Sequence, residues 1–209
     1  MEKRLVQFLA SVLLIMLFAP VFAAVTVGLR EGNWIEYSVT YTGAPPDDYP
    51  ERVRIDVKRI QGSEITVEIN GDLLNGQDDS RSLTFNLELG APDLIIIPAN
   101  LSAGSEFYHK DLGNITIEGV EDYSLEGETR TLVYTTFTQL YFRWDRATGI
   151  LIQADKVEDA FSQKYLAVKA SLGQALISEF DPLMLYVPII LVIVVSIVAS
   201  YFLLKRKRR

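Results

Sequence analysis

Residues 141–153 read YFRWDRATGILIQ, and this stretch predicts a β-hairpin. The aromatic and aliphatic residues on either side form the two expected strands, and residues 145–149 form the turn. Asp145 can accept a hydrogen bond from the backbone two residues further along, which opens the turn. Gly149 can adopt a positive φ at little steric cost and close the turn. We therefore predict that Asp145 and Gly149 are structural turn residues rather than parts of a functional site.

The sequence before this hairpin has a period of two residues. Apolar and polar residues alternate, which is typical of antiparallel strands with one face in water. The alternation covers residues 34–41, 52–58, 64–69 and 82–89, and further strands are predicted at 114–118, 129–137 and 140–144. The connections are a proline-rich loop at 43–50, a tight turn at 61–63 and a longer polar connection at 71–79.

No amphipathic helix is indicated between residues 24 and 158. Residues 161–177 admit two interpretations: a last strand, or a strand whose Ala- and Leu-rich end begins a helix that leads into a membrane. The predicted fold is all-β, with a single antiparallel domain. It is built either as a curved sheet, like half of a barrel, or as a sandwich of two sheets.

The C-terminal residues predict a membrane anchor. Residues 183–204 read LMLYVPIILVIVVSIVASYFLL without a charge, and a helix of that length spans about 33 Å, close to the thickness of one hydrocarbon core. Residues 205–209 are five consecutive cations, and such a flank stays on the cytoplasmic side. We expect a single transmembrane helix with a cytoplasmic basic tail.

The N-terminal residues predict export. Lys3 and Arg4 precede the apolar residues 5–22, and small residues follow, so residues 1–23 read as a signal peptide cleaved after Ala23. An uncleaved anchor is the competing interpretation, because the apolar region is long. In both cases residues 24–182 lie outside the cytoplasm, and with the signal peptide cleaved the chain is a single-pass protein of the cell membrane.

The charge and cysteine content narrow the classes of function. Residues 24–182 hold 13 of the 20 Lys and Arg residues and 26 of the 27 Asp and Glu residues, which gives a net charge near −13. Such a surface repels nucleic acid, so no nucleic-acid partner is expected. The chain has no cysteine, which excludes disulfides and thiolate chemistry.

Several short motifs together resemble a known group of proteins. They are the residues Gly28, Gly32-Asn33-Trp34 and Tyr37, the segments IIPANL at 96–101 and GNITIEG at 113–119, and the hairpin with Trp144-Asp145 and Thr148-Gly149. They are similar to those of archaeal exported proteins of uncharacterised function, which implies a signal peptide, a β-rich ectodomain and one C-terminal membrane helix. More distantly, the hairpin is similar to those in the curved sheets of lipoprotein-carrier-type proteins, which implies a half-barrel with an apolar concave face.

Motifs that carry chemistry are absent from the sequence. It contains no HExxH, GxSxG or glycine-rich phosphate loop, and we predict no catalytic, cofactor-binding or metal-binding residue. The one histidine, His109, is expected in a loop or at a rim, and three acidic pairs, at 47–48, 78–79 and 121–122, are expected to be solvated turns. Asn100 and Asn114 begin the sequons NLS and NIT, so both are candidate glycosylation sites in an exported chain.

The favoured function is therefore non-catalytic: a surface binding or envelope-associated module with an envelope or surface protein as its partner. Two alternatives are open. A carrier of an apolar or lipid ligand requires an unfilled apolar groove, lined by residues such as Phe85, Phe142 and Trp144. A hydrolase without a sequence motif requires carboxylates, or a serine and a lysine, that converge in a cleft.

Overall fold

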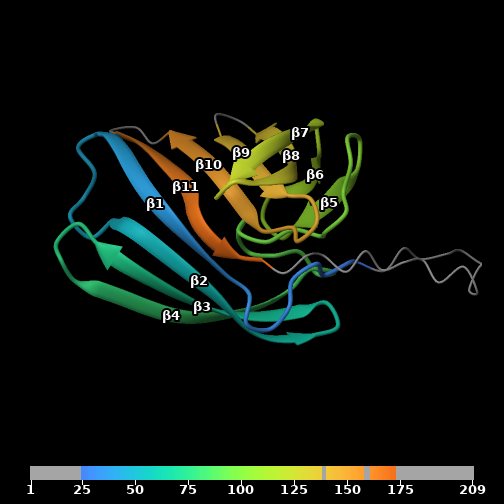
Figure 1. Cartoon of the computed structure of the whole chain (residues 1–209), viewed down its shortest axis with the longest axis horizontal. Helices are drawn as coiled ribbons and strands as arrows, with labels where there is room; N and C mark the ends of the chain where they lie inside the picture. The colour runs from blue at the N-terminus through green and yellow to red at the C-terminus, as the bar shows by residue number, and fades with distance from the viewer. Residues whose placement is uncertain (1–24, 138–139, 158–160, 173–209) are drawn as a thin grey trace, which may run out of the picture.

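The computed structural model describes residues 25–137, 140–157 and 161–172, which form strands and loops (Figure 1). Within these ranges the structure contains no helix, and so none that could span a membrane. The predicted signal peptide at 1–23, the membrane helix at 183–204 and the basic tail at 205–209 lie outside the described residues.

The prediction of an all-β antiparallel fold is confirmed. Nine strands form one sheet in the order β4-β3-β2-β1-β11-β10-β9-β8-β7, and β5 pairs with β6 in a small second sheet. All strand pairs are antiparallel. The strands are β1 Trp34–Gly43, β2 Pro50–Gln61, β3 Glu64–Leu73, β4 Asp78–Asn86, β5 Glu106–His109, β6 Gly113–Thr116, β7 Gly119–Leu125, β8 Glu128–Phe137, β9 Leu140–Asp145, β10 Leu151–Val157 and β11 Phe161–Ser171.

The sheet consists of two meanders that meet where the first strand pairs with the last. β1 pairs with β2 on one side and with β11 on the other, with Trp34 opposite Ser171 and Gly43 opposite Phe161. Figure 1 shows that the sheet is strongly curved. Because the nine strands belong to one sheet, the curved sheet is the architecture seen, and not a sandwich of two large sheets.

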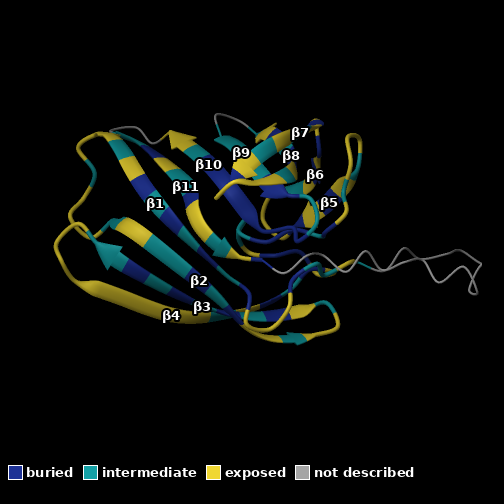
Figure 2. Cartoon of the chain, viewed as in Figure 1, coloured by how far each residue is buried: buried dark blue, intermediate teal, exposed yellow. Residues whose placement is uncertain are grey.

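The core lies on the concave face, where alternate residues of the strands are buried (Figure 2). In β1 to β3 these residues include Ile35, Ile55 and Ile65, each at most 2% exposed. A crossing segment, residues 87–105 between β4 and β5, packs against the same face. Ile96 forms an isolated bridge with Ile150, and Phe107 stacks edge-on against Trp144 with 5.9 Å between ring centroids. This segment and the β5–β6 pair therefore fill part of the concave side.

Several predicted boundaries differ from the structure. The polar connection predicted at 71–79 is shorter, because β3 extends to Leu73, β4 begins at Asp78, and the Leu73 N–H donates to the Gln77 carbonyl at 2.8 Å across the turn. The strand predicted at 82–89 ends at Asn86. β5 and β7 were not predicted. β7 includes the acidic pair Glu121-Asp122, which looked like a solvated turn in the sequence.

Candidate functional site

A groove of about 660 Å³ lies on the part of the concave face that the crossing segment leaves uncovered. It is enclosed by residues from β1 to β4 on one side and from β9 to β11 on the other. Its apolar walls include Val53, Ile55, Ile69, Phe142, Leu151 and Ala154. The groove exists because the sheet curves more widely than the crossing segment can fill.

The floor of the groove is formed by Leu94 and Ile95 of the crossing segment. Two hydrogen bonds fix this floor to the second meander. The Trp144 indole N–H donates to the Leu94 carbonyl at 2.7 Å, and the Leu151 N–H donates to the Ile95 carbonyl at 2.8 Å. Since Trp144 is fully buried, its indole could not leave this acceptor without losing a buried hydrogen bond. The floor is therefore a built part of the fold.

Tyr37 lies in the wall without offering its hydroxyl to a ligand. The hydroxyl donates to the Leu151 carbonyl at 2.7 Å and is buried. Burial, with a smaller contribution from the charge of Asp93, raises the pKa of Tyr37 far above its usual value, so the side chain stays neutral. The ring of Tyr37 consequently lines the groove, while its hydroxyl is engaged in a hydrogen bond within the fold.

An aromatic cluster borders the end of the groove where β1 finishes and β2 begins. Tyr49 stacks edge-on against Phe161 at 5.2 Å and against Tyr41 at 6.2 Å between ring centroids. Tyr49 also lines the groove. Rings packed in this way provide a rigid apolar rim.

Charged residues also line the groove. One of them is Arg81, which lies on the concave face of β4. Arg81 stands opposite Ile69 in the β3–β4 register, and both residues line the groove. Burial raises the pKa of Tyr165 on β11, and the positive charge of Arg81 acts against that shift. The guanidinium therefore acts across the groove from the edge strand. Asp48, Asp79, Lys156 and Gln163 complete the polar lining.

The outer end of the groove, with the aromatic cluster and the charged residues, is called the rim. It lies at one end of the strands, and the last described residue lies at the other end. Trp34 and Ser171 pair at one end, close to Leu172, the last described residue. Gly43 pairs with Phe161 at the other end, next to the aromatic cluster. The strands therefore separate the rim from the position at which the chain continues beyond Leu172.

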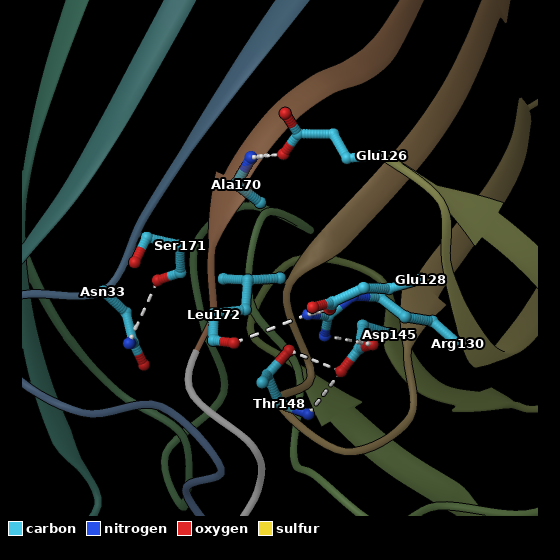
Figure 3. Close-up of polar contacts among 9 residues, drawn as sticks. All are labelled: Asn33, Glu126, Glu128, Arg130, Asp145, Thr148, Ala170, Ser171 and Leu172. Carbon is cyan, nitrogen blue, oxygen red and sulfur yellow. Dashed lines mark hydrogen bonds and ion pairs between the residues drawn. The ribbon is translucent and has the colours of Figure 1, made fainter.

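A polar cluster holds the end of β11 (Figure 3). Arg130 donates to the Leu172 carbonyl at 3.4 Å, Asn33 Nδ2 donates to the Ser171 carbonyl at 3.2 Å, and the Ala170 N–H donates to Glu126 at 3.0 Å. Three different segments thus fix the last residues of this strand. This arrangement is structural, because its polar atoms bind one another.

The turn residues Asp145 and Gly149 are part of this region rather than of the groove. Asp145 Oδ1 accepts from both the N–H and the hydroxyl of Thr148 at 2.8 Å, three residues further on and not two as the sequence suggested. Gly149 has φ +76° and its N–H donates to the Asp145 carbonyl at 2.7 Å. Asp145 in addition pairs with Arg130, a contact that sequence reasoning missed because the two residues lie on different strands.

The other residues that the sequence singled out are dispersed. Asn100 and Asn114 are exposed, and Asn100 has φ +62°. The expectation that His109 lies in a loop or at a rim is wrong: it ends β5 and is buried, and its Nδ1 accepts from the N–H groups of Asp111 and Leu112 at 3.2 Å each. No group of three or more His, Asp or Glu side chains that could hold a metal occurs within residues 25–137, 140–157 and 161–172.

Of the three aromatic residues proposed to line an apolar groove, only Phe142 does so. Phe85 and Trp144 are buried in the core.

Comparison of the chain with models of protein families, with curated proteins and with solved structures gives no match.

Proposed function

We propose that this chain is a non-catalytic binding module that carries an apolar ligand in the groove of its curved sheet. The observation behind this proposal is the unfilled groove of about 660 Å³ between apolar walls. Small-molecule sites are concave, mainly apolar and about 300–1,000 Å³ in volume. A ligand that removed this surface from water would gain about 25 cal/mol for each Å² of apolar area buried.

The proposal gives the groove a carrying role rather than a catalytic one. Apart from its charged residues Asp48, Asp79, Arg81 and Lys156, its walls are mainly aliphatic and aromatic, and the Tyr37 hydroxyl donates to a backbone carbonyl. Burial raises the pKa of Asp93, next to the floor, and its carboxylate accepts from the Ile95 N–H at 3.2 Å. This carboxylate supports the floor of the groove, so we assign it a structural role.

We further propose that the module is displayed outside the cell on a single membrane helix, as the sequence indicates. The resemblance to archaeal exported, membrane-anchored proteins supports the same arrangement, and an envelope or surface protein is then the expected partner. Because Leu172 lies at the strand ends away from the aromatic rim, an anchor that follows it would leave the rim free to exchange ligand with such a partner.

The test is the binding of a neutral apolar dye, N-phenyl-1-naphthylamine, to a fragment of residues 24–180, which holds every described strand. We expect saturable binding with one site per chain. Gly71 lines the groove, and a Cβ there would meet no atom closer than 3.7 Å, so Gly71→Phe should fold and fill the groove.

Asn70→Phe is the matched control, because the neighbouring residue of a strand points to the opposite face. We expect dye binding to be lost in Gly71→Phe and kept in Asn70→Phe. Absence of saturable binding, or equal binding by both variants, would contradict the carrier.

A further inference from the structure

We propose that the ligand of this groove is a single-chain amphiphile with an anionic head group, and that Arg81 binds the head. This inference rests on the proposed carrier function and adds the chemical class of the ligand. It is based on one juxtaposition. Arg81 lies at the open edge of an apolar groove, on the face of β4 that also carries the apolar residues Leu83 and Phe85.

The concave face of β4 changes from charged to apolar along the strand. Its inward residues pair with β3 as Asp79 with Gly71, Arg81 with Ile69, Leu83 with Val67 and Phe85 with Ile65. Phe85 is buried, Leu83 is half-buried, and Arg81 is exposed. Arg81 is thus the charged residue next to the apolar part of the strand, with Asp79 one step further out. This gradient matches a molecule with one polar end and one apolar end.

Arg81 is available to a ligand. Among the described residues no carboxylate forms an ion pair with it, whereas Arg52, Arg54, Arg130 and Arg143 all have such partners. Its positive charge acts on two groups around the groove, Tyr165 on β11 and Asp93 beside the floor. A guanidinium offers several N–H donors in a fork that fits carboxylate and phosphate oxygens.

The neighbouring charges set the orientation of the ligand. Asp48 and Asp79 line the outer part of the groove, so an anionic head that stopped there would be repelled. A head placed at Arg81 has the apolar walls of Val53, Ile55 and Phe142 within reach of its chain. A cationic head would instead be attracted by Asp48 and Asp79 and repelled by Arg81, so it would stop in the outer part of the groove.

Arg81 also has an alternative explanation in the fold itself. β4 is an edge strand, and an inward-pointing charge protects such an edge from pairing with another chain. That role predicts a change in association when the charge is removed, and no change in ligand preference. The two explanations therefore differ in a measurable way.

The experiment uses the full-length chain in membranes and three photoreactive lipids with the same chain and the reactive group near its end: a fatty acid, an alkyl phosphate and the uncharged alcohol. Labelling is measured by mass spectrometry on the peptides that contain Phe142 and Leu151. We expect the acid, the phosphate or both to label these peptides about tenfold or more above the alcohol, since hydrogen bonds to charged groups are strong. The better of the two anions identifies the head group.

Arg81→Gln should reduce anionic labelling to the level of the alcohol, whereas Arg52→Gln, on β2 two strands away from β4 and paired with Glu36, should not. Equal labelling by anions and alcohol, or unchanged labelling in Arg81→Gln with only a change in association, would overturn the assignment of Arg81 and leave the carrier standing. Failure of all three lipids to label the groove would overturn both proposals.

Discussion

The Nη1 atom of Arg130 lies 3.2 Å from Oδ2 of Asp145, and the side chains are only 15% and 2% exposed. The same guanidinium donates to the carbonyl of Leu172, and the same carboxylate accepts from Thr148. One ion pair thus connects the turn after β9 to the end of β11. Because the carboxylate is buried, its charge depends on Arg130 for compensation.

Arg130→Ala should therefore destabilise the fold strongly. Removing one partner of a buried ion pair leaves the other charge uncompensated, which costs about 3–5 kcal/mol. The measurement is urea unfolding of the 24–180 fragment. Lys58→Ala is the control, because Lys58 and Glu68 also form an ion pair, at 2.7 Å, but with side chains 50% and 40% exposed. A loss in Arg130→Ala as small as that in the control would mean that the Asp145 carboxylate does not depend on Arg130.

A second prediction separates backbone strain from steric exclusion in the hairpin. Gly149 has φ +76°, and a Cβ there would lie 2.0 Å from the carbonyl oxygen of Ile97. Gly62 has φ +60°, but a Cβ there would meet nothing within 4 Å. Gly62→Ala should cost about 1–2 kcal/mol from the left-handed backbone alone. Gly149→Ala should cost clearly more, because the crossing segment must also move.

The comparison is made by the thermal unfolding of both variants under the same conditions. Equal losses of stability would show that the crossing segment yields at Ile97 without cost. A larger loss in Gly62→Ala would contradict the packing of Ile97 against the turn.

The sequence predicts the strands of this fold better than their arrangement. Alternation located β1, β2 and β3, because one face of each strand is in water and the other in the core. It could not predict that β1 pairs with β11, since that contact joins residues more than a hundred positions apart. β5 was missed because only Phe107 and His109 are its inward residues, and one of these two is polar.

The groove was harder to predict, for a physical reason. The position of a residue in the alternation of a strand shows which face of the sheet its side chain occupies. Whether other residues fill that face depends on the curvature of the sheet and on the crossing segment. Arg81 was missed because the predicted strand began one residue after it. The available signal was its spacing of two and four residues from Leu83 and Phe85, which places a cation on the apolar face of the strand.

A third prediction concerns topology. If residues 1–23 direct export and residues 183–204 span the membrane, protease added to intact cells should digest residues 24–182 and spare a tag at the C-terminus. Lysed cells serve as the control, since the tag should then also be lost. Protection of residues 24–182 in intact cells would contradict the arrangement.

The last prediction concerns Asp93 and pH. Burial raises the pKa of this carboxyl above its ordinary value of 3.8, against the opposing effects of the Ile95 N–H and the charge of Arg81. The unfolded chain therefore releases the proton at lower pH than the folded chain. As pH rises from below 3.8 through the raised pKa, this group lowers stability, and the loss is complete above the folded-state pKa.

Asp93→Asn removes this titration and keeps an oxygen to accept from Ile95. The variant should be more stable than the parent at neutral pH, and the difference should vanish as pH falls below 3.8. Urea unfolding of parent and variant across this range measures the difference directly. Asp111→Asn, an exposed acid in the turn after β5, should show no such gain. If Asp93→Asn were instead less stable at neutral pH, the charge of Arg81 would outweigh burial at this carboxylate.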